Sequence, residues 1–214
     1  MLIDYGADIN AVDNSGDTVL HTAFKWFKKT NYDCIKMLID HGADVNAVDK
    51  FEENVLHAAF KTKDGGDYDC IKMLIDHGAD INAVDNSGKT VLDAAFQRFE
   101  VTNYDCIKML IDHGADINTV DISRDTVLHA AFKRFGGSSY DCIKMLIDHG
   151  ADVNAVDNSG KTVLHAAFKR FGGSNYDCIK MLIDHGADIN AVDNSGDTVL
   201  HAAFKGSMWQ ITIV

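Results

Sequence analysis

The sequence predicts an all-α protein, a solenoid of helix-turn-helix units with projecting hairpin loops. The tripeptide Gly-Ala-Asp recurs every 36 residues along the chain, and a fixed period of that length is typical of repeat architectures. Each period contains two stretches with apolar residues at helical spacing, separated from the next period by a polar, turn-rich segment. Neither predicted helix is long enough to be stable alone, so we expect neighbouring units to stabilise one another.

The period divides the chain into whole units, two half-units and a tail. The whole units, each starting at an Asp, span 13–48, 49–84, 85–120, 121–156 and 157–192. A leading half-unit spans 1–12 and a trailing one spans 193–205, so the solenoid covers 1–205 and leaves a non-repeat tail at 206–214. Met1 aligns with Met37, which places the start of the chain inside a second helix with its apolar stripe uncovered. We interpret this as a longer array that was cut.

The first helix of the unit 13–48 is expected to begin after a threonine. Thr18 is a favourable N-cap, and the residues after it form one apolar stripe at helical spacing, namely Val19, Leu20, Ala23, Phe24 and Phe27. The second helix is expected to follow a polar cap residue, which in successive units is Asn31, Asp67, Asn103, Ser139 and Asn175. Its apolar face contains Cys34, Ile35, Leu38 and Ile39, and Gly42 should end it in a left-handed conformation.

The loop between units reads Ala-Asp-Val-Asn-Ala-Val-Asp-Asn-Ser-Gly-Asp and predicts a hairpin. Gly16 lies where the turn is expected to need a positive φ. Two other units replace this glycine, with Glu52 and Arg124. A side chain there costs about 1–2 kcal/mol unless the turn changes type, so we expect the second and fourth loop tips to differ in shape from the others.

The unit resembles an ankyrin repeat over residues 1–205. The resemblance rests on Asp-x-x-Gly-x-Thr-x-Leu-His-x-Ala at 13–23, on Met-Leu-Ile in the second helix and on Gly-Ala-Asp-Val-Asn-Ala at 42–47. Tetratricopeptide units lack the Gly-Ala-Asp segment, and leucine-rich repeats would need asparagine ladders, which we expect to be absent here. The chain departs from the family in having Val19 where proline is usual, Phe24 where alanine is usual, and three extra residues between the helices of each unit.

A row of histidines at one repeat position invites a metal or proton-relay hypothesis. The row contains His21, His57, His129, His165 and His201, with Asp93 in the remaining unit. The resemblance implies instead that each imidazole bonds the cap threonine and nearby backbone, and Asp93 would break a relay. Cys34 and His41 are two helical turns apart, too far to share one ion without other ligands. We therefore expect no metal site and no cofactor.

Composition excludes several functions. Thirty-two acidic and 20 basic residues give a net charge of -12, which disfavours nucleic acid and anionic membrane surfaces as partners. The sequence contains no nucleophile-elbow, phosphate-loop or dinucleotide motif, so we predict that the protein is not an enzyme. The five cysteines, one per whole unit, suit buried thiols better than disulfides, which favours a reducing intracellular location, the cytoplasm.

The units differ from one another mainly in two regions. The second helix reads Tyr-Asp-Cys-Ile-Lys-Met-Leu-Ile-Asp-His in all five, whereas the loop tips and the ends of the first helices vary. The resemblance implies that these two regions form the concave surface that grips partner proteins. An alternative is that exposed positions simply drift. Phe51 and Ile122 on projecting tips, together with Trp26, favour binding, because exposed apolar side chains are costly unless they meet a partner.

The sequence therefore predicts a scaffold that binds a partner protein through its loop tips and first-helix face. The expected contact residues are Asn14, Ser15, Asp17, Lys25, Trp26, Lys50, Phe51, Glu53, Lys61, Arg98, Ile122, Asp125, Lys133, Arg134, Lys161 and Arg170. The alternative is a structural spacer, or a truncated array, without a dedicated partner. Three hypotheses remain for the tail: a cloning scar at Gly206-Ser207, a PDZ-domain ligand ending at Val214, and a cover for the open end of the array.

Overall fold

The computed structural model describes residues 2–26, 32–62, 67–97, 104–134, 140–171 and 176–206. These residues belong to two compact units, which we call the N-unit (1–116) and the C-unit (117–214) and describe separately. None of the described helices is long and apolar enough to cross a membrane.

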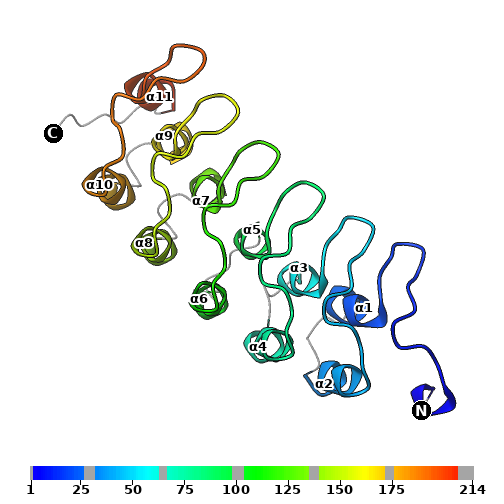
Figure 1. Ribbon diagram of the computed structural model, residues 1–214. Helices are drawn as coiled ribbons and strands as arrows, with labels where there is room; N and C mark the ends of the chain where they lie inside the picture. The colour runs from blue at the N-terminus through cyan, green and yellow to red at the C-terminus, as the bar shows by residue number, and fades with distance from the viewer. Residues whose placement is uncertain are drawn as a thin grey trace. The chain divides into compact units, whose positions relative to one another are not determined.

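The N-unit contains a short 3-10 helix followed by three pairs of α-helices (Figure 1). The elements are η1 (Ile3–Tyr5), α1 (Val19–Trp26), α2 (Tyr32–Asp40), α3 (Val55–Phe60), α4 (Tyr68–Asp76), α5 (Val91–Gln97) and α6 (Tyr104–Asp112). Helix α3 packs between α1 and α5, and α4 packs between α2 and α6. The first helices of the repeats in the N-unit thus form one row and the second helices form another, with the hairpin loops projecting beside the first row.

The C-unit repeats this arrangement. Its elements are α7 (Val127–Arg134), α8 (Tyr140–Asp148), α9 (Val163–Phe171), α10 (Tyr176–Asp184) and α11 (Val199–Gly206). Helix α9 packs between α7 and α11, and α8 packs against α10. In the described parts of both units, β-structure is limited to isolated antiparallel bridges across the hairpins, such as Val48 with Asn54 and Val156 with Thr162. The predicted all-α helix-turn-helix architecture is confirmed.

Phenylalanine fills the core beneath the first helices. Phe24, Phe60, Phe96 and Phe132 are among the largest fully buried side chains, beside leucines such as Leu20 and Leu56. Burying a side chain of this kind contributes about 1.5–3 kcal/mol to stability. The position at which the ankyrin pattern has alanine is therefore a main apolar contact in this chain.

The predicted helix ends are confirmed where the structure describes them. The Asp67 side chain accepts a hydrogen bond from the backbone N–H of Cys70 at 3.0 Å, as an N-cap should. Gly42 has a φ of 87°, and the N–H of Ala43 bonds the carbonyl of Leu38, which closes the end of α2. The other predicted caps and one apolar residue lie outside the described residues: Asn31, Asn103, Ser139, Asn175 and Phe27.

Asparagine side chains join successive repeats, so the expectation that an asparagine ladder is absent is wrong. Asn10 donates from Nδ2 to the Gly42 carbonyl at 3.0 Å and accepts from the Asp44 N–H at 2.8 Å. The same two-way bond recurs 36 residues later from Asn46, and in the C-unit from Asn154. One amide thus satisfies an acceptor and a donor of the next repeat, which fixes the spacing between loops.

Candidate functional site

An aspartate at the base of each hairpin organises its tip. Asp13 Oδ1 accepts hydrogen bonds from the N–H groups of Ser15 at 2.7 Å and Asp17 at 3.0 Å. Asp49 makes the matching bonds to Phe51 and Glu53, at 2.8 and 3.1 Å. A short polar side chain that bonds the backbone two and four residues ahead stabilises a tight turn. This aspartate therefore sets the direction in which the tip side chains point.

Backbone hydrogen bonds also connect neighbouring tips. In the N-unit the Lys50 N–H donates to the Ser15 carbonyl at 3.1 Å, and the Asn86 N–H donates to the Phe51 carbonyl at 2.9 Å. In the C-unit the Asn194 N–H donates to the Ser159 carbonyl at 2.9 Å. Because the tips are held on both sides, little backbone freedom would be lost when a partner binds them.

The second and fourth tips keep the same turn as the others, so the prediction that their shape differs is wrong. Glu52 and Arg124 have φ values of 60° and 59°, in the left-handed region that Gly16 occupies at 80°. The Glu52 N–H bonds the Asp49 carbonyl at 3.0 Å, as the Gly16 N–H bonds Asp13. The aspartate and the neighbouring tips determine the backbone, so the replaced residue adopts the strained conformation.

Two of the predicted contact residues are apolar side chains that project from the tips. Phe51 in the N-unit is 59% exposed and Ile122 in the C-unit is 71% exposed. Three polar residues from the same prediction, Asn14, Ser15 and Lys50, are also exposed. These five side chains are accessible to a partner.

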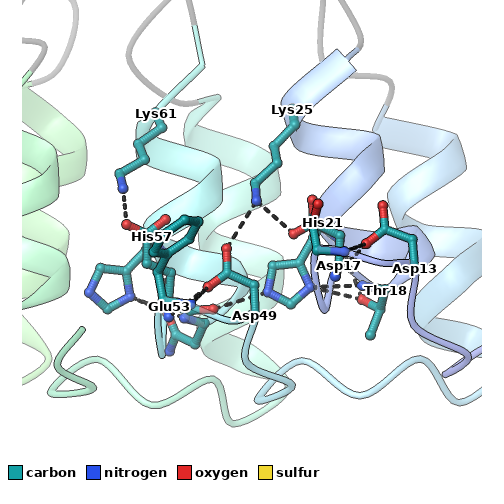
Figure 2. Close-up of polar contacts among 12 residues, drawn as sticks. Asp13, Asp17, Thr18, His21, Lys25, Asp49, Glu53, His57 and Lys61 are labelled. Atoms are coloured by element: carbon teal, nitrogen blue, oxygen red, sulfur yellow. Dashed lines mark hydrogen bonds and ion pairs between the residues drawn. The ribbon is translucent and has the colours of Figure 1, made fainter. Parts of the chain in front are cut away.

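Four other predicted contact residues of the N-unit bind one another instead (Figure 2). Lys25 Nζ lies 2.6 Å from Asp17 Oδ1 and 3.1 Å from Asp49 Oδ2, and Lys61 Nζ pairs with Glu53. Asp17 and Glu53 are buried. Partial burial alone would lower the pKa of Lys25, but its two carboxylate partners outweigh that effect and raise it. The positive charge of these two lysines, which are expected contact residues, is therefore neutralised within the chain.

The C-unit contains the same kind of pairing. Lys133 Nζ lies 2.7 Å from Asp125 Oδ2 and 3.5 Å from Asp157 Oδ2, and Lys161 Nζ lies 3.5 Å from Asp193 Oδ2. Burial would raise the pKa of Asp157, but hydrogen bonds from two backbone N–H groups and the charge of Lys133 lower it overall. Lys133 of α7 thus contacts the hairpin of its own repeat and the hairpin of the next repeat. Lys161 lies in one hairpin and contacts the following one.

The buried histidines cap the first helices and also reach the next repeat (Figure 2). The Thr18 N–H donates to His21 Nδ1 at 3.3 Å, which leaves the ring proton on Nε2, and Nε2 donates to the Glu53 carbonyl at 3.2 Å. His57 contacts Asn54 and the Lys89 carbonyl in the same way. Burial lowers the pKa of both imidazoles. The capping role is confirmed, and the bond to the following repeat is an addition that the sequence pattern does not reveal.

Asp93 reproduces the cap at the position where histidine is missing. Its Oδ2 atom accepts hydrogen bonds from the Thr90 N–H at 2.9 Å and from the Thr90 hydroxyl at 3.0 Å, and its own N–H donates to that hydroxyl. A carboxylate therefore preserves the start of α5.

The described residues include no group of three or more His, Cys, Asp or Glu side chains that could hold a metal ion. Cys70, Cys106, Cys142 and Cys178 are buried and Cys34 is half-buried. Burial raises the pKa of Cys70 and Cys142 to about 12 and that of Cys106 and Cys178 to about 11. Since the thiolate is the nucleophile, these thiols are poorly suited to redox or nucleophilic chemistry at neutral pH.

The remaining predicted contact residues lie beyond what the structure describes. Arg98 and Val214 are outside the described residues. Trp26, Arg134 and Arg170 lie in α1, α7 and α9, but their side chains are not among the described ones. Their role in binding stays a prediction.

The second-helix row presents a different, polar surface. A groove between α2 and α4 is lined by Tyr32, Lys36, Asp69, Met73 and His77, among others. Lys36 Nζ lies 2.6 Å from Asp40 Oδ2, one turn along the same helix, and both groups are about half exposed. Exposed pairs of this kind contribute little to stability, and the second helices repeat the pair in every unit.

Comparison with known proteins identifies the fold family. A family model described as ankyrin repeats (3 copies) matches residues 1–49, 28–121, 103–193 and 128–211. The crystal structure of the ankyrin repeat domain of Bcl-3, described as a unique member of the IkappaB protein family, is similar with a TM-score of 0.73 and 27% sequence identity. The similarity covers 94% of this chain and 84% of that one. No curated protein sequence matches. The chain belongs to the ankyrin repeat family.

Proposed function

We propose that this protein is a binding scaffold that recognises a partner protein through its exposed loop tips and first-helix face. Ankyrin repeats are in general scaffolds for protein–protein interaction and not enzymes. The observation that carries the proposal is the exposure of Phe51 and Ile122 on tips whose backbone is fixed by hydrogen bonds. Rigidly presented apolar side chains are the kind of residue that dominates binding energy.

The ion pairs indicate which kind of contact the partner would make. Lys25, Lys61 and Lys133 each have a carboxylate partner within the chain, so they offer little unpaired positive charge to a partner's carboxylates. Recognition would then depend on apolar contact at the tips, with the exposed Asn14, Ser15 and Lys50 as polar surroundings. We expect the affinity to change only modestly with salt concentration.

The test compares two sets of substitutions against a partner captured from lysate with the unaltered chain and identified by mass spectrometry. One variant replaces Trp26, Phe51 and Ile122 by serine, and the matched control replaces Lys36, Lys72 and Lys108 on the second helices. We expect the first variant to lose at least about tenfold in affinity and the second to bind normally. Loss of binding only in the second variant would place the interface on the second helices and contradict the proposal.

The spacer hypothesis predicts a different outcome. A structural spacer, or an array without a dedicated partner, would yield no protein whose capture depends on either set of side chains. The exposed apolar tips favour the binding hypothesis, because a spacer gains nothing from displaying Phe51 and Ile122 to water.

A further inference from the structure

Two of the loop tips differ from the others in two ways at once. Four tips share the sequence Asn-Ser-Gly, at 14–16, 86–88, 158–160 and 194–196. The tip of the unit 49–84 reads Lys50-Phe51-Glu52, and the tip of the unit 121–156 reads Ile122-Ser123-Arg124. Each of these two tips contains a large apolar side chain and has a charged residue in place of glycine. The two changes therefore occur together and in the same two repeats.

The charged residue at each of these tips occupies a position where any side chain is unfavourable. Glu52 and Arg124 have φ values of 60° and 59°, in the left-handed region that residues with a Cβ atom rarely adopt. A Cβ atom at the aligned Gly16 would also lie 2.9 Å from the Lys50 backbone N atom of the next hairpin. Both residues therefore lower the stability of the fold relative to the glycine that the other tips have.

The side chains of Glu52 and Arg124 do not recover this loss through contacts within the described part of the chain. Both side chains are exposed, and neither makes a hydrogen bond or an ion pair with another described residue. The acidic residues one position later differ in this respect, because Glu53 and Asp125 each pair with a lysine of the following helix. A charged residue that lowers stability and has no partner in the fold is a candidate for contact with another molecule.

An exposed apolar side chain accompanies each of these charges. Phe51 directly precedes Glu52 and is 59% exposed, and Ile122 lies two residues before Arg124 and is 71% exposed. A charge pair that forms beside an apolar contact is partly shielded from water, which makes it stronger than a fully exposed pair. The backbone of the tip 50–52 is held by Asp49 and by the next hairpin, so Glu52 is presented in one backbone conformation. Each tip thus combines an apolar contact with one charge, which is negative in the N-unit and positive in the C-unit.

We propose that Glu52 and Arg124 determine which partner segments the tips accept. This inference rests on the proposed function and names the chemistry of the partner at the same site. At the tip 50–52 the partner places a lysine or arginine beside the apolar side chain that covers Phe51. At the tip 122–124 it places a carboxylate beside the apolar side chain that covers Ile122. The opposite arrangement brings two like charges together and is rejected.

The test begins with a random dodecapeptide library that is displayed on phage and selected against the unaltered chain. Peptides that no longer bind when Phe51 is replaced by serine report on the tip 50–52, and we expect a lysine or arginine next to a large apolar residue to be enriched among them. Peptides that depend on Ile122 should instead contain aspartate or glutamate in that place. Tip-dependent peptides without these preferences would overturn the inference.

Substitutions at Glu52 separate the effect of its charge from that of backbone strain. A synthetic peptide with the Phe51-dependent consensus is titrated against Glu52→Gly and Glu52→Gln, and the thermal midpoint of each variant is measured. Both variants should bind the peptide about three- to tenfold more weakly, whereas only Glu52→Gly should have a higher midpoint. Asp40→Asn, which removes one carboxylate from the second-helix row, is the matched control for net charge and should bind normally.

Charge exchange is the decisive step. Glu52→Lys should prefer a peptide in which the basic residue is replaced by glutamate, and Arg124→Glu should prefer the reverse exchange in the Ile122-dependent peptide. If Phe51→Ser weakens binding while the Glu52 variants bind as the unaltered chain does, the inference is overturned and the proposed function stands. A library that yields no peptide dependent on Phe51 or Ile122 would contradict the proposed function itself, and this inference with it.

Discussion

The two helix rows of the N-unit and of the C-unit differ in how much their exposed side chains vary from repeat to repeat. The second helices have one sequence throughout, and their surface carries the same exposed lysine–aspartate pair in every repeat, as in Lys36 and Asp40. The hairpins and first helices vary at exposed positions such as Phe51, while buried aspartate and histidine side chains hold the backbone in one shape. Variation at the tips is tolerated because the bonds that determine the turn come from residues that do not vary.

Some of the variation in the first-helix row is paired. Lysine at the helix position accompanies an acidic residue eight positions earlier in four repeats, with the pairs Lys25–Asp17, Lys61–Glu53, Lys133–Asp125 and Lys205–Asp197. In the unit 85–120 the earlier residue is Lys89, and the helix position is Gln97 instead of lysine. The unit 157–192 does not follow this pairing, because both Lys161 and Lys169 are lysine. Where the ion pair occurs, it links a hairpin to its own first helix.

Removing a buried carboxylate from the hairpin row should have the largest effect. Asp49→Ala deletes two bonds to backbone N–H groups and one to Lys25, so the free energy of unfolding should fall by about 2–3 kcal/mol in urea titrations. The control is Asp40→Ala in the second-helix row, which also removes a lysine partner. It should leave the free energy of unfolding almost unchanged, and equal costs at the two sites would contradict the contrast between the rows.

Acid should weaken the histidine contacts of the hairpin row. Burial lowers the pKa of His21, His57 and His129 in the folded state below the ordinary 6.5, so the unfolded chain binds protons more readily. Their contribution is complete above about pH 6.5 and should be lost progressively as the pH falls from 6.5 towards the folded-state values.

The measurement for this pH effect is the urea midpoint between pH 7.5 and pH 5.5. A His57→Asp variant, which copies the natural cap at Asp93, should show a smaller decline across this window than the unaltered chain. A midpoint that does not change with pH would show that these imidazoles are not held neutral by the fold.

Introducing glycine at a strained tip position and removing glycine from an unstrained one should change the stability of the protein in opposite directions. Glu52→Gly relieves a positive φ of 60° and should stabilise the protein by roughly 0.5–1 kcal/mol. Gly16→Ala introduces that strain and places a methyl group 2.9 Å from the Lys50 N atom, so it should destabilise by at least about 1 kcal/mol. Thermal unfolding checks both, and destabilisation by Glu52→Gly would mean that the glutamate side chain contributes more than its backbone strain costs.

A chelator should have the smallest effect. Since Thr18 and the Glu53 carbonyl occupy both ring nitrogens of His21, this imidazole has no lone pair for a metal ion. Excess EDTA is expected to leave the unfolding midpoint unchanged. A decrease of more than a few degrees would reopen the question of a metal.

The sequence alone predicts the helices, because apolar spacing and cap residues act over a few neighbouring positions. The capping role of histidine follows from the resemblance to ankyrin repeats. The sequence does not reveal the contacts that cross from one repeat to the next. Asn10 and His21 bond groups 32 residues away, and a repeat pattern does not show which partner a polar side chain finds. For the same reason the sequence predicts Lys25 and Asp17 to be contact residues. Their charges suggest exposure, and only the structure shows that they form an ion pair with each other.

The contrast between the rows is tested most directly by site-specific photo-crosslinking. A photoreactive amino acid is placed at Ser15 or Phe51 on the tips, or at Lys36 or Lys72 on the second helices, and each protein is irradiated in lysate. The proposed function predicts protein adducts from the tip positions and none above background from the second helices. Adducts from Lys36 and Lys72 alone would show that the constant row, and not the variable one, is the binding surface.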